Sequence, residues 1–375
     1  MGVRYDGLDI GQFRAIQRLR IDGLGCVNLI TGKNNTAKTT ILEAIRILSS
    51  GASLTMLAQV LRLREEDFNE GDESIRASDT DNVFPFSSLF RGYPEFSDSV
   101  LPILIQGLGG EHPSCLTIAP TWMAETRGED GVRRIQPIAP SVSDDDEGIP
   151  GLRIQMDNAE RLLSLDALRR APYRGSFRRP DVPDDRRLPC QYVAPGAADR
   201  TAALGPLWDR IALSDLENDV IEALKLIDDG ISAVSMVGGE GTRSSRTAIV
   251  RSSRLTRPMP LKSFGDGLNR LFGIVLSLVN AKDGLLLIDE FENGLHHTVQ
   301  EDTWRMIFRL ASKLNVQVFA TTHSMDAVEA FQKAAADTPE EGVLIRLARK
   351  GELILPTVFC ESELSVVTRN QIEVR

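Results

Sequence analysis

The sequence lacks long apolar runs. No stretch of its 375 residues approaches the roughly 18 uninterrupted apolar residues that a membrane-spanning helix needs. Residues 1–10 carry acids and glycine, whereas a signal peptide begins with a basic segment followed by an apolar one. We therefore expect no membrane association and a cytoplasmic location.

Cysteine is also scarce and is not arranged in pairs. The four cysteines show no C-x-x-C spacing, so neither a zinc site nor a disulfide framework is indicated. They are Cys26, Cys115, Cys190 and Cys360. Apolar residues make up 42% of the chain and charged residues 26%, so the protein can bury a sizeable core without such cross-links. A reducing compartment is the simplest interpretation.

Basic residues are fewer than acidic ones. The chain has 43 lysines and arginines against 53 acids, a formal net charge of -10. This balance disfavours nonspecific coating of nucleic acid, although a local basic face could still bind phosphates. One arginine-rich run is diluted by aspartates and has few aromatic residues, so we interpret it as a solvated loop in preference to a DNA-binding patch. It comprises Arg169, Arg170, Arg174, Arg178, Arg179, Arg186 and Arg187.

The spacing of apolar residues predicts alternating strands and helices at both ends of the chain. The N-terminal elements are strands at 8–13, 18–21 and 27–31 and a helix at 39–48. The C-terminal elements are a helix at 268–280, a strand at 285–288, a helix at 298–314 and a strand at 316–320. The strand-helix-strand alternation is typical of a parallel sheet, so we expect an α/β fold.

The middle of the chain has a weaker pattern, which we interpret as an α+β insertion. Its predicted elements are helices at 54–64 and 208–227, strands at 100–105, 115–118 and 152–156, an acidic stretch at 65–81 and a solvated loop at 143–147. Four segments follow from this pattern. They are 1–51, the first half of a core; 52–260, the insertion; 261–335, the second half of the core; and 336–375, a strand-rich tail.

The strongest motif lies between the predicted strand at 27–31 and the predicted helix at 39–48. It matches the phosphate-loop pattern G-x-x-x-x-G-K-[ST], except that Ala37 replaces the second glycine. The loop consists of Gly32, Lys33, Asn34, Asn35, Thr36, Ala37, Lys38, Thr39 and Thr40. Backbone N–H groups and the helix N-terminus would bind the β-phosphate of ATP, and Lys38 would neutralise β and γ oxygens. Thr39 would ligate Mg²⁺.

Alanine at position 37 adds a Cβ at a crowded turn and tolerates a left-handed φ poorly. The affinity for nucleotide could suffer, but a methyl group is the smallest such addition. We expect ATP binding to survive.

A second motif is an apolar strand that ends in two acids, Asp289 and Glu290. This is the Walker B arrangement. Asp289 would bind the metal through water, and Glu290 would orient or deprotonate the attacking water, because phosphoryl transfer depends on positioning and electrostatic stabilisation. Alone, such a strand is a weak motif, since surface acids often follow a buried strand.

Further motifs occur in a fixed order around this strand. Ser263-Phe264-Gly265-Asp266-Gly267 precedes it, and Glu292-Asn293-Gly294-Leu295-His296 and Thr321-Thr322-His323-Ser324 follow it. The series resembles an ABC-type ATPase head of the SMC, RecF and OLD-like branch, over residues 1–50 and 260–335. The resemblance implies a P-loop fold with a mixed, largely parallel sheet.

The resemblance also implies how the site is assembled. In that family, a serine-glycine signature binds the γ-phosphate held by the opposite subunit, so Ser263, Gly265 and Gly267 would act across a homodimer interface. His323 would sense the γ-phosphate. The signature lacks the leucine and glutamine of transporter forms. Such heads usually carry a glutamine in a separate Q-loop; Gln106 and Gln191 are candidates for it, but neither is distinguished from an ordinary surface residue.

Adjacent histidines follow Glu292 and raise the question of a metal site. His296 and His297 should point apart, as adjacent histidines do on most backbones, so we expect a loop at the dimer seam instead.

Three functions remain open from the sequence. The first is an ATPase that dimerises around ATP and signals to a protein effector, as in anti-phage systems; a TOPRIM nuclease domain is not expected, since about 40 residues follow Phe331. The second is a RecF-like repair ATPase that clamps DNA. The third is a weakly hydrolysing, nucleotide-dependent scaffold. The choice of defence over repair rests on analogy.

Overall fold

The computed structural model describes most of the chain. The described residues are 3–64, 66, 86–97, 99–127, 133–138, 148–164, 187–196, 204–238, 246–337, 341–360 and 363. The arginine-rich run apart from Arg187, the acidic stretch apart from residue 66, and the loop at 143–147 lie outside them. None of the described helices is long and apolar enough to cross a bilayer.

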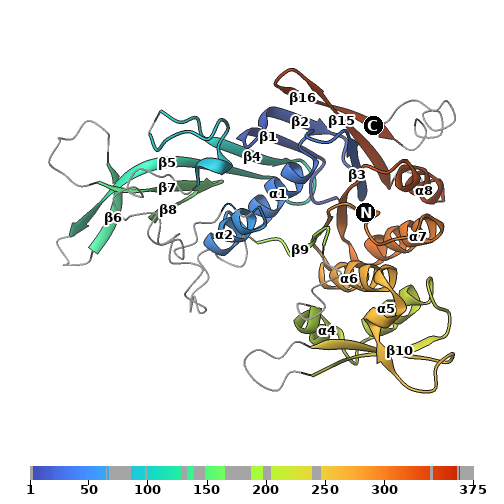
Figure 1. Cartoon of the computed structure of the whole chain (residues 1–375). Coiled ribbons are helices and arrows are strands. Elements are labelled where there is room, and N and C mark those ends of the chain that lie inside the picture. The colour runs from blue at the N-terminus through green and yellow to red at the C-terminus, as the bar shows by residue number, and fades with distance from the viewer. Residues whose placement is uncertain are drawn as a thin grey trace, which may run out of the picture.

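A six-stranded sheet forms the centre of the described structure, with strand order β16-β15-β3-β14-β13-β9 (Figure 1). Its strands are β3 (Val27–Gly32), β9 (Cys190–Val193), β13 (Leu285–Ile288), β14 (Gln317–Thr321), β15 (Gly342–Lys350) and β16 (Leu353–Cys360). The first five run parallel, and β16 pairs antiparallel with β15. The predicted mixed, largely parallel sheet is confirmed.

Helices cover both faces of this sheet, which explains why β3, β13 and β14 are buried throughout. They are α1 (Lys38–Ser49) on one face and α6 (Asp266–Asn280), α7 (His297–Leu314) and α8 (Met325–Ala335) on the other. In β13, Leu286 and Ile288 join the core formed with α6, α7 and α8, whereas Leu285 and Leu287 join the core formed with α1. Alternate side chains thus serve opposite faces, as strand geometry requires.

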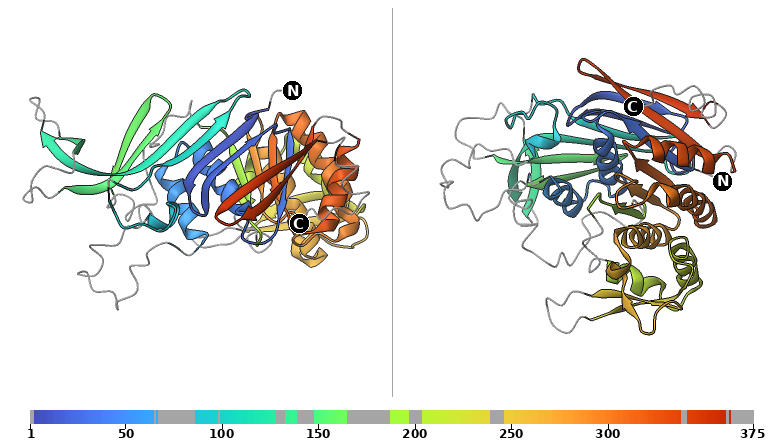
Figure 2. Two further views of the ribbon diagram at one scale, coloured as in Figure 1. Left: turned by 90° about the horizontal axis from the view of Figure 1, so that it is seen from above. Right: turned by 45° about the vertical axis from the view of Figure 1, so that its right-hand side comes forward.

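A second, antiparallel sheet packs on the other side of α1 and extends away as a curved lobe (Figure 2). Its strands are β1 (Gly7–Phe13), β2 (Ile16–Asp22), β4 (Ile103–Leu108), β5 (Ser114–Arg127), β6 (Arg133–Ile138), β7 (Ile149–Met156) and β8 (Ala159–Ser164). Because β1 pairs with β4, the N-terminal hairpin and the strands of the predicted insertion share one sheet. Helix α2 (Leu54–Arg62) is capped by Ser53, whose hydroxyl accepts a hydrogen bond from the N–H of Met56.

The predicted single helix at 208–227 is wrong, because two helices occupy this region. They are α4 (Gly205–Ile211) and α5 (Asp215–Leu224), which adjoin a small sheet of β10 (Ile231–Val237), β11 (Thr247–Ser252) and β12 (Met259–Pro260). Leu213 adopts a left-handed φ of 64° between them, and its N–H donates to the Glu217 carboxylate over 2.7 Å. A continuous helix cannot pass through that backbone conformation.

Candidate active site

The phosphate loop connects β3 to α1, and its shape depends on Gly32. A Cβ at Gly32 would lie 2.5 Å from the Leu347 carbonyl oxygen and 2.8 Å from Thr36 Oγ1, and its φ is 148°. Only glycine fits there. Thr36 Oγ1 donates to the Lys33 carbonyl over 2.7 Å and closes the loop.

Lys38 begins α1 and folds back into the loop. Its Nζ donates to the carbonyl oxygens of Gly32 and Lys33 over 2.6 Å and 3.0 Å. Burial lowers the pKa of Lys38, and the nearby Glu292 and Asp289 act in the opposite direction. The ammonium group is therefore a partly buried cation beside backbone carbonyls and acids. A bound anion would stabilise its charge and so offset the cost of burying it.

Ala37 does adopt the left-handed conformation that alanine disfavours, with φ 66° and ψ 25°. A residue with a Cβ destabilises the folded state by about 1–2 kcal/mol in this conformation. Glycine would remove that strain, but its greater chain entropy in the unfolded state would offset part of the gain. Replacing Ala37 with glycine should raise the free energy of unfolding by about 0.5–1 kcal/mol, measured by urea denaturation.

Ala58→Gly is the matched control for this substitution. Ala58 lies within the right-handed α2, where the same change should lower the stability by about 1 kcal/mol. Equal losses for both variants would show that the left-handed strain at Ala37 is unimportant.

Asp289 directly follows β13 and is hydrogen-bonded through both carboxylate oxygens. Thr39 Oγ1 and Thr321 Oγ1 donate to its Oδ1 over 3.2 Å and 2.5 Å, and the Tyr192 hydroxyl donates to its Oδ2 over 3.2 Å. The residue is 3% exposed. The loop and the Walker B strand, 250 residues apart in sequence, thus meet at one carboxylate.

Tyr192 is a site residue that sequence reasoning missed. It lies on β9, whose strand was assigned to the insertion but belongs to the central sheet beside β13. Burial raises the pKa of Tyr192, so the hydroxyl keeps its proton and donates to Asp289. The Arg46 guanidinium stacks 4.2 Å from the centre of the tyrosine ring. Its strand is only four residues long and includes the polar Gln191, so the sequence carried little sign of it.

Glu290 is held at its backbone and at its carboxylate. Its φ is 49°, its N–H donates to Thr321 Oγ1 over 2.9 Å, and Asn293 Nδ2 donates to its Oε2 over 2.7 Å. The side chain is half-buried next to Asp289. A carboxylate oriented in this way can accept a proton from a water bound beside it.

His323 follows β14 and pairs with Glu292. Its Nδ1 and its backbone N–H both lie 3.0 Å from Glu292 Oε1, and Thr322 Oγ1 donates to Oε2 over 2.8 Å. The imidazole is 53% exposed. Glu292 therefore fixes the end of β14 and the orientation of the histidine ring.

The signature residues Ser263, Gly265 and Gly267 lie just before α6 and in its first turn. Ser263 belongs to a short 3₁₀ turn (Leu261–Phe264), Gly265 has a φ of 95°, and Gly267 lies in the first turn of α6. Ser263 and Gly265 are exposed. Among the described residues, no hydrogen bond or ion pair joins these three positions to the phosphate loop.

The adjacent histidines and the two candidate glutamines lie outside the group of residues around Asp289. His296 and His297 were expected to point apart, but their ring centres lie 4.3 Å from each other, because extended His296 caps α7 and directs its Nδ1 to Thr298. Gln106 lies in the antiparallel sheet, where its amide donates to Cys115 Sγ. Gln191 lies on β9 next to Tyr192.

The residues around Asp289 suit a magnesium ion that is shared with a nucleotide. Mg²⁺ prefers oxygen ligands and is usually held by one or two carboxylates, substrate phosphates and water. Asp289 supplies a carboxylate and Thr39 a hydroxyl within 3.2 Å of it. The donor set fits the ion.

Comparison with known proteins identifies the family of the chain. Residues 120–329, more than half of the chain, match the family model described as "AAA domain, putative AbiEii toxin, Type IV TA system". The chain belongs to this family. Membership of this family confirms the prediction of a P-loop ATPase.

Individual relatives are distant. This AAA-family chain is 22% identical over 386 residues to the "ATP/GTP phosphatase" of Helicobacter pylori (strain ATCC 700392 / 26695), covering 96% of this chain and 97% of the relative. An uncharacterized protein of Methanocaldococcus jannaschii is 34% identical over 94 residues, which are 25% of this chain and 82% of that protein.

The solved structures that match this chain include SMC head domains. The SMC head bound to the C-winged helix domain of ScpA has a TM-score of 0.48 and 11% identity, covering 95% of this chain and 98% of that one. The SMC head of Thermotoga maritima has a TM-score of 0.44 and 14% identity, with coverage of 95% and 99%.

Proposed function

We propose that this protein is a Mg²⁺-dependent ATPase whose heads pair around ATP and, in the paired state, act on a protein effector. The observation that carries the proposal is the meeting of the phosphate loop with the Walker B acids, in which Thr39 Oγ1 lies 3.2 Å from Asp289 Oδ1. Glu290 lies next in sequence and is oriented by Asn293.

Each residue of the site would have a separate task. The backbone N–H groups of the loop, from Gly32 to Thr40, and Lys38 would bind the phosphates. Thr39 and Asp289 would hold Mg²⁺, which when bound neutralises charge on the phosphate oxygens. Glu290 would orient the attacking water and accept its proton, and His323 would donate to the γ-phosphate.

The position of the signature supports action between two copies of the chain. Because Ser263 and Gly265 are exposed and make no described contact with their own phosphate loop, we propose that they and Gly267 complete the site of a partner head. On this view segments 1–51 and 261–335 carry the ATPase together with β9, β15 and β16, which complete the central sheet, while the rest of 52–260 is available to an effector.

The biological setting is proposed from the family. Its description names a putative AbiEii toxin of a Type IV TA system. This supports a defence role with a protein effector. The name of the Helicobacter pylori relative suggests testing GTP beside ATP as a substrate.

The test is phosphate release from ATP and from GTP with Mg²⁺, with size-exclusion chromatography in each nucleotide, with and without DNA. We expect Mg²⁺-dependent hydrolysis and a nucleotide-dependent dimer that does not require DNA. Hydrolysis that depends on DNA would favour a repair ATPase. A protein that binds nucleotide without hydrolysing it would be the scaffold.

A further inference from the structure

We infer that Arg270 is a positioning residue that couples the signature helix α6 to Glu290, so that the site responds to what the signature contacts. The inference rests on the proposed function, because it concerns how the same site is regulated. It assigns a task to a residue that the motif series does not include.

Arg270 is almost fully buried and is directed at the ends of two strands. It is 2% exposed, and its guanidinium donates to the carbonyl oxygens of Ala194, Asp289 and Glu290 over 2.6 Å, 2.8 Å and 2.9 Å. Burial lowers the pKa of Arg270, and the nearby acid Asp289 raises it. Among the described residues it forms no ion pair with a carboxylate, so its charge is held chiefly by backbone carbonyls.

Burying a guanidinium without an ion-pair partner is costly, so a merely structural role is a poor explanation. The backbone that Arg270 contacts is itself strained. Glu290 has a φ of 49°, a left-handed conformation that side-chain-bearing residues rarely adopt and that persists only where the surroundings impose it. Thr321 holds the N–H of Glu290 and Arg270 holds its carbonyl oxygen. Together they determine where the Glu290 side chain points.

The other end of the connection is the signature itself. Arg270 lies three residues after Gly267, on the same side of α6. A Cβ at Gly267 would lie 3.1 Å from the Gly294 carbonyl oxygen, and a Cβ at Gly294 would lie 3.5 Å from Arg270 Cβ. The first turns of α6 are thus packed directly on the turn that follows Glu290. A shift of the signature must move Arg270, and with it the carbonyl of Glu290.

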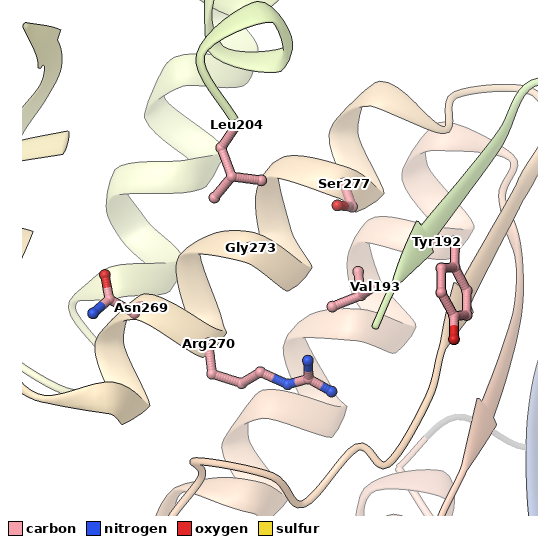
Figure 3. A pocket seen from close by; sticks show the side chains of 7 residues that line it. All are labelled: Tyr192, Val193, Leu204, Asn269, Arg270, Gly273 and Ser277. Carbon is pink, nitrogen blue, oxygen red and sulfur yellow. The ribbon is translucent and has the colours of Figure 1, made fainter. Parts of the chain in front are cut away.

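A small cavity of about 40 Å³ adjoins the guanidinium (Figure 3). Tyr192, Arg270 and Gly273 are among the residues that line it. It is large enough for water, and the buried Nε of Arg270 has no hydrogen-bond partner among the described residues. A Cβ at Gly273 would meet no atom within 4 Å, so alanine fits there. Gly273→Ala is therefore a control on the same helix that leaves the Arg270 hydrogen bonds in place.

The first experiment compares Arg270→Gln, Arg270→Lys and Gly273→Ala for kcat, KM, ATP affinity and ATP-dependent dimerisation. A misplacement of about 1 Å at a reacting group can cost 10²-fold, so Arg270→Gln should lower kcat by about 10²-fold while ATP affinity and dimerisation stay near wild type. Arg270→Lys should recover part of kcat, since lysine keeps the charge but not the fork of donors. Gly273→Ala should match wild type.

A fluorescence measurement reads the coupling separately from turnover. Phe291 follows Glu290 and stacks on Trp304, with ring centres 4.0 Å apart, so Trp304 reports on the Walker B turn. In a Trp122→Phe, Trp208→Phe, Glu290→Gln background, ATP should change the Trp304 emission. The change should be absent when Arg270→Gln is added.

The inference is overturned if Arg270→Gln keeps a wild-type kcat, if its kcat falls only in proportion to its ATP affinity, or if the Trp304 change persists without Arg270. If Arg270→Gln does not fold, the same comparisons are made on Arg270→Lys, which must then show a lowered kcat at unchanged affinity. A wild-type protein that hydrolyses no ATP would refute the proposed function itself. Wild-type hydrolysis with an unaffected Arg270→Gln variant refutes only the coupling.

Discussion

Replacing Glu290 with glutamine should lower kcat for ATP by about 10²- to 10⁴-fold, the usual contribution of a positioned general base. The amide keeps the size of the side chain and still leaves an oxygen for the Asn293 amide to donate to, but it cannot accept a proton from water. ATP affinity should stay near wild type. Because hydrolysis would open the dimer, the ATP-bound dimer should accumulate, as measured by size-exclusion chromatography.

Glu329→Gln is the matched control for this result. Glu329 is exposed on α8, and among the described residues it has no hydrogen bond or ion pair with the site. Its replacement should therefore leave kcat unchanged. If Glu290→Gln hydrolyses ATP as fast as wild type, Glu290 is not the base.

Replacing Lys38 with alanine should remove most of the affinity for ATP. Loss of one partner of a buried charge contact costs about 2–5 kcal/mol, which is roughly a 30- to 4000-fold rise in Kd at 1.4 kcal/mol per tenfold. The variant also loses the two hydrogen bonds from Lys38 to the loop carbonyls. Binding is measured with a fluorescent ATP analogue and Mg²⁺.

The control is Lys282→Ala, which removes an exposed lysine in the turn between α6 and β13. It changes the net charge equally and should leave Kd unaltered. A Lys38→Ala protein that is folded and binds ATP as wild type does would place the nucleotide somewhere other than the phosphate loop.

The parts of the fold that could be predicted are those that local pattern determines. Leu285 to Ile288 is uniformly apolar and short, as a buried parallel strand must be, and α1 carries a regular apolar stripe after the phosphate loop. The order of strand, loop and helix around Lys38 indicated both the sheet and the nucleotide chemistry before any contact was known.

The parts that could not be predicted depend on contacts between distant segments. Tyr192 reaches Asp289 across 97 positions, and its strand has only four residues, too few for a periodic signal. The break at Leu213 interrupts an apolar stripe that continues on both sides of it. Arg270 could not be distinguished from an ordinary polar residue on a helix. Its proposed role depends on hydrogen bonds to the backbone carbonyls of Asp289 and Glu290, whose directions the sequence does not show.

The most direct test of the central claim is phosphate release from ATP over a range of protein concentrations, for wild type and Glu290→Gln, with Mg²⁺ and with a chelator. A site completed by a second head predicts that wild-type activity per molecule rises with protein concentration to a plateau, requires Mg²⁺ and is nearly lost in Glu290→Gln. Activity per molecule that is constant at all concentrations, or that persists in Glu290→Gln, would contradict the account.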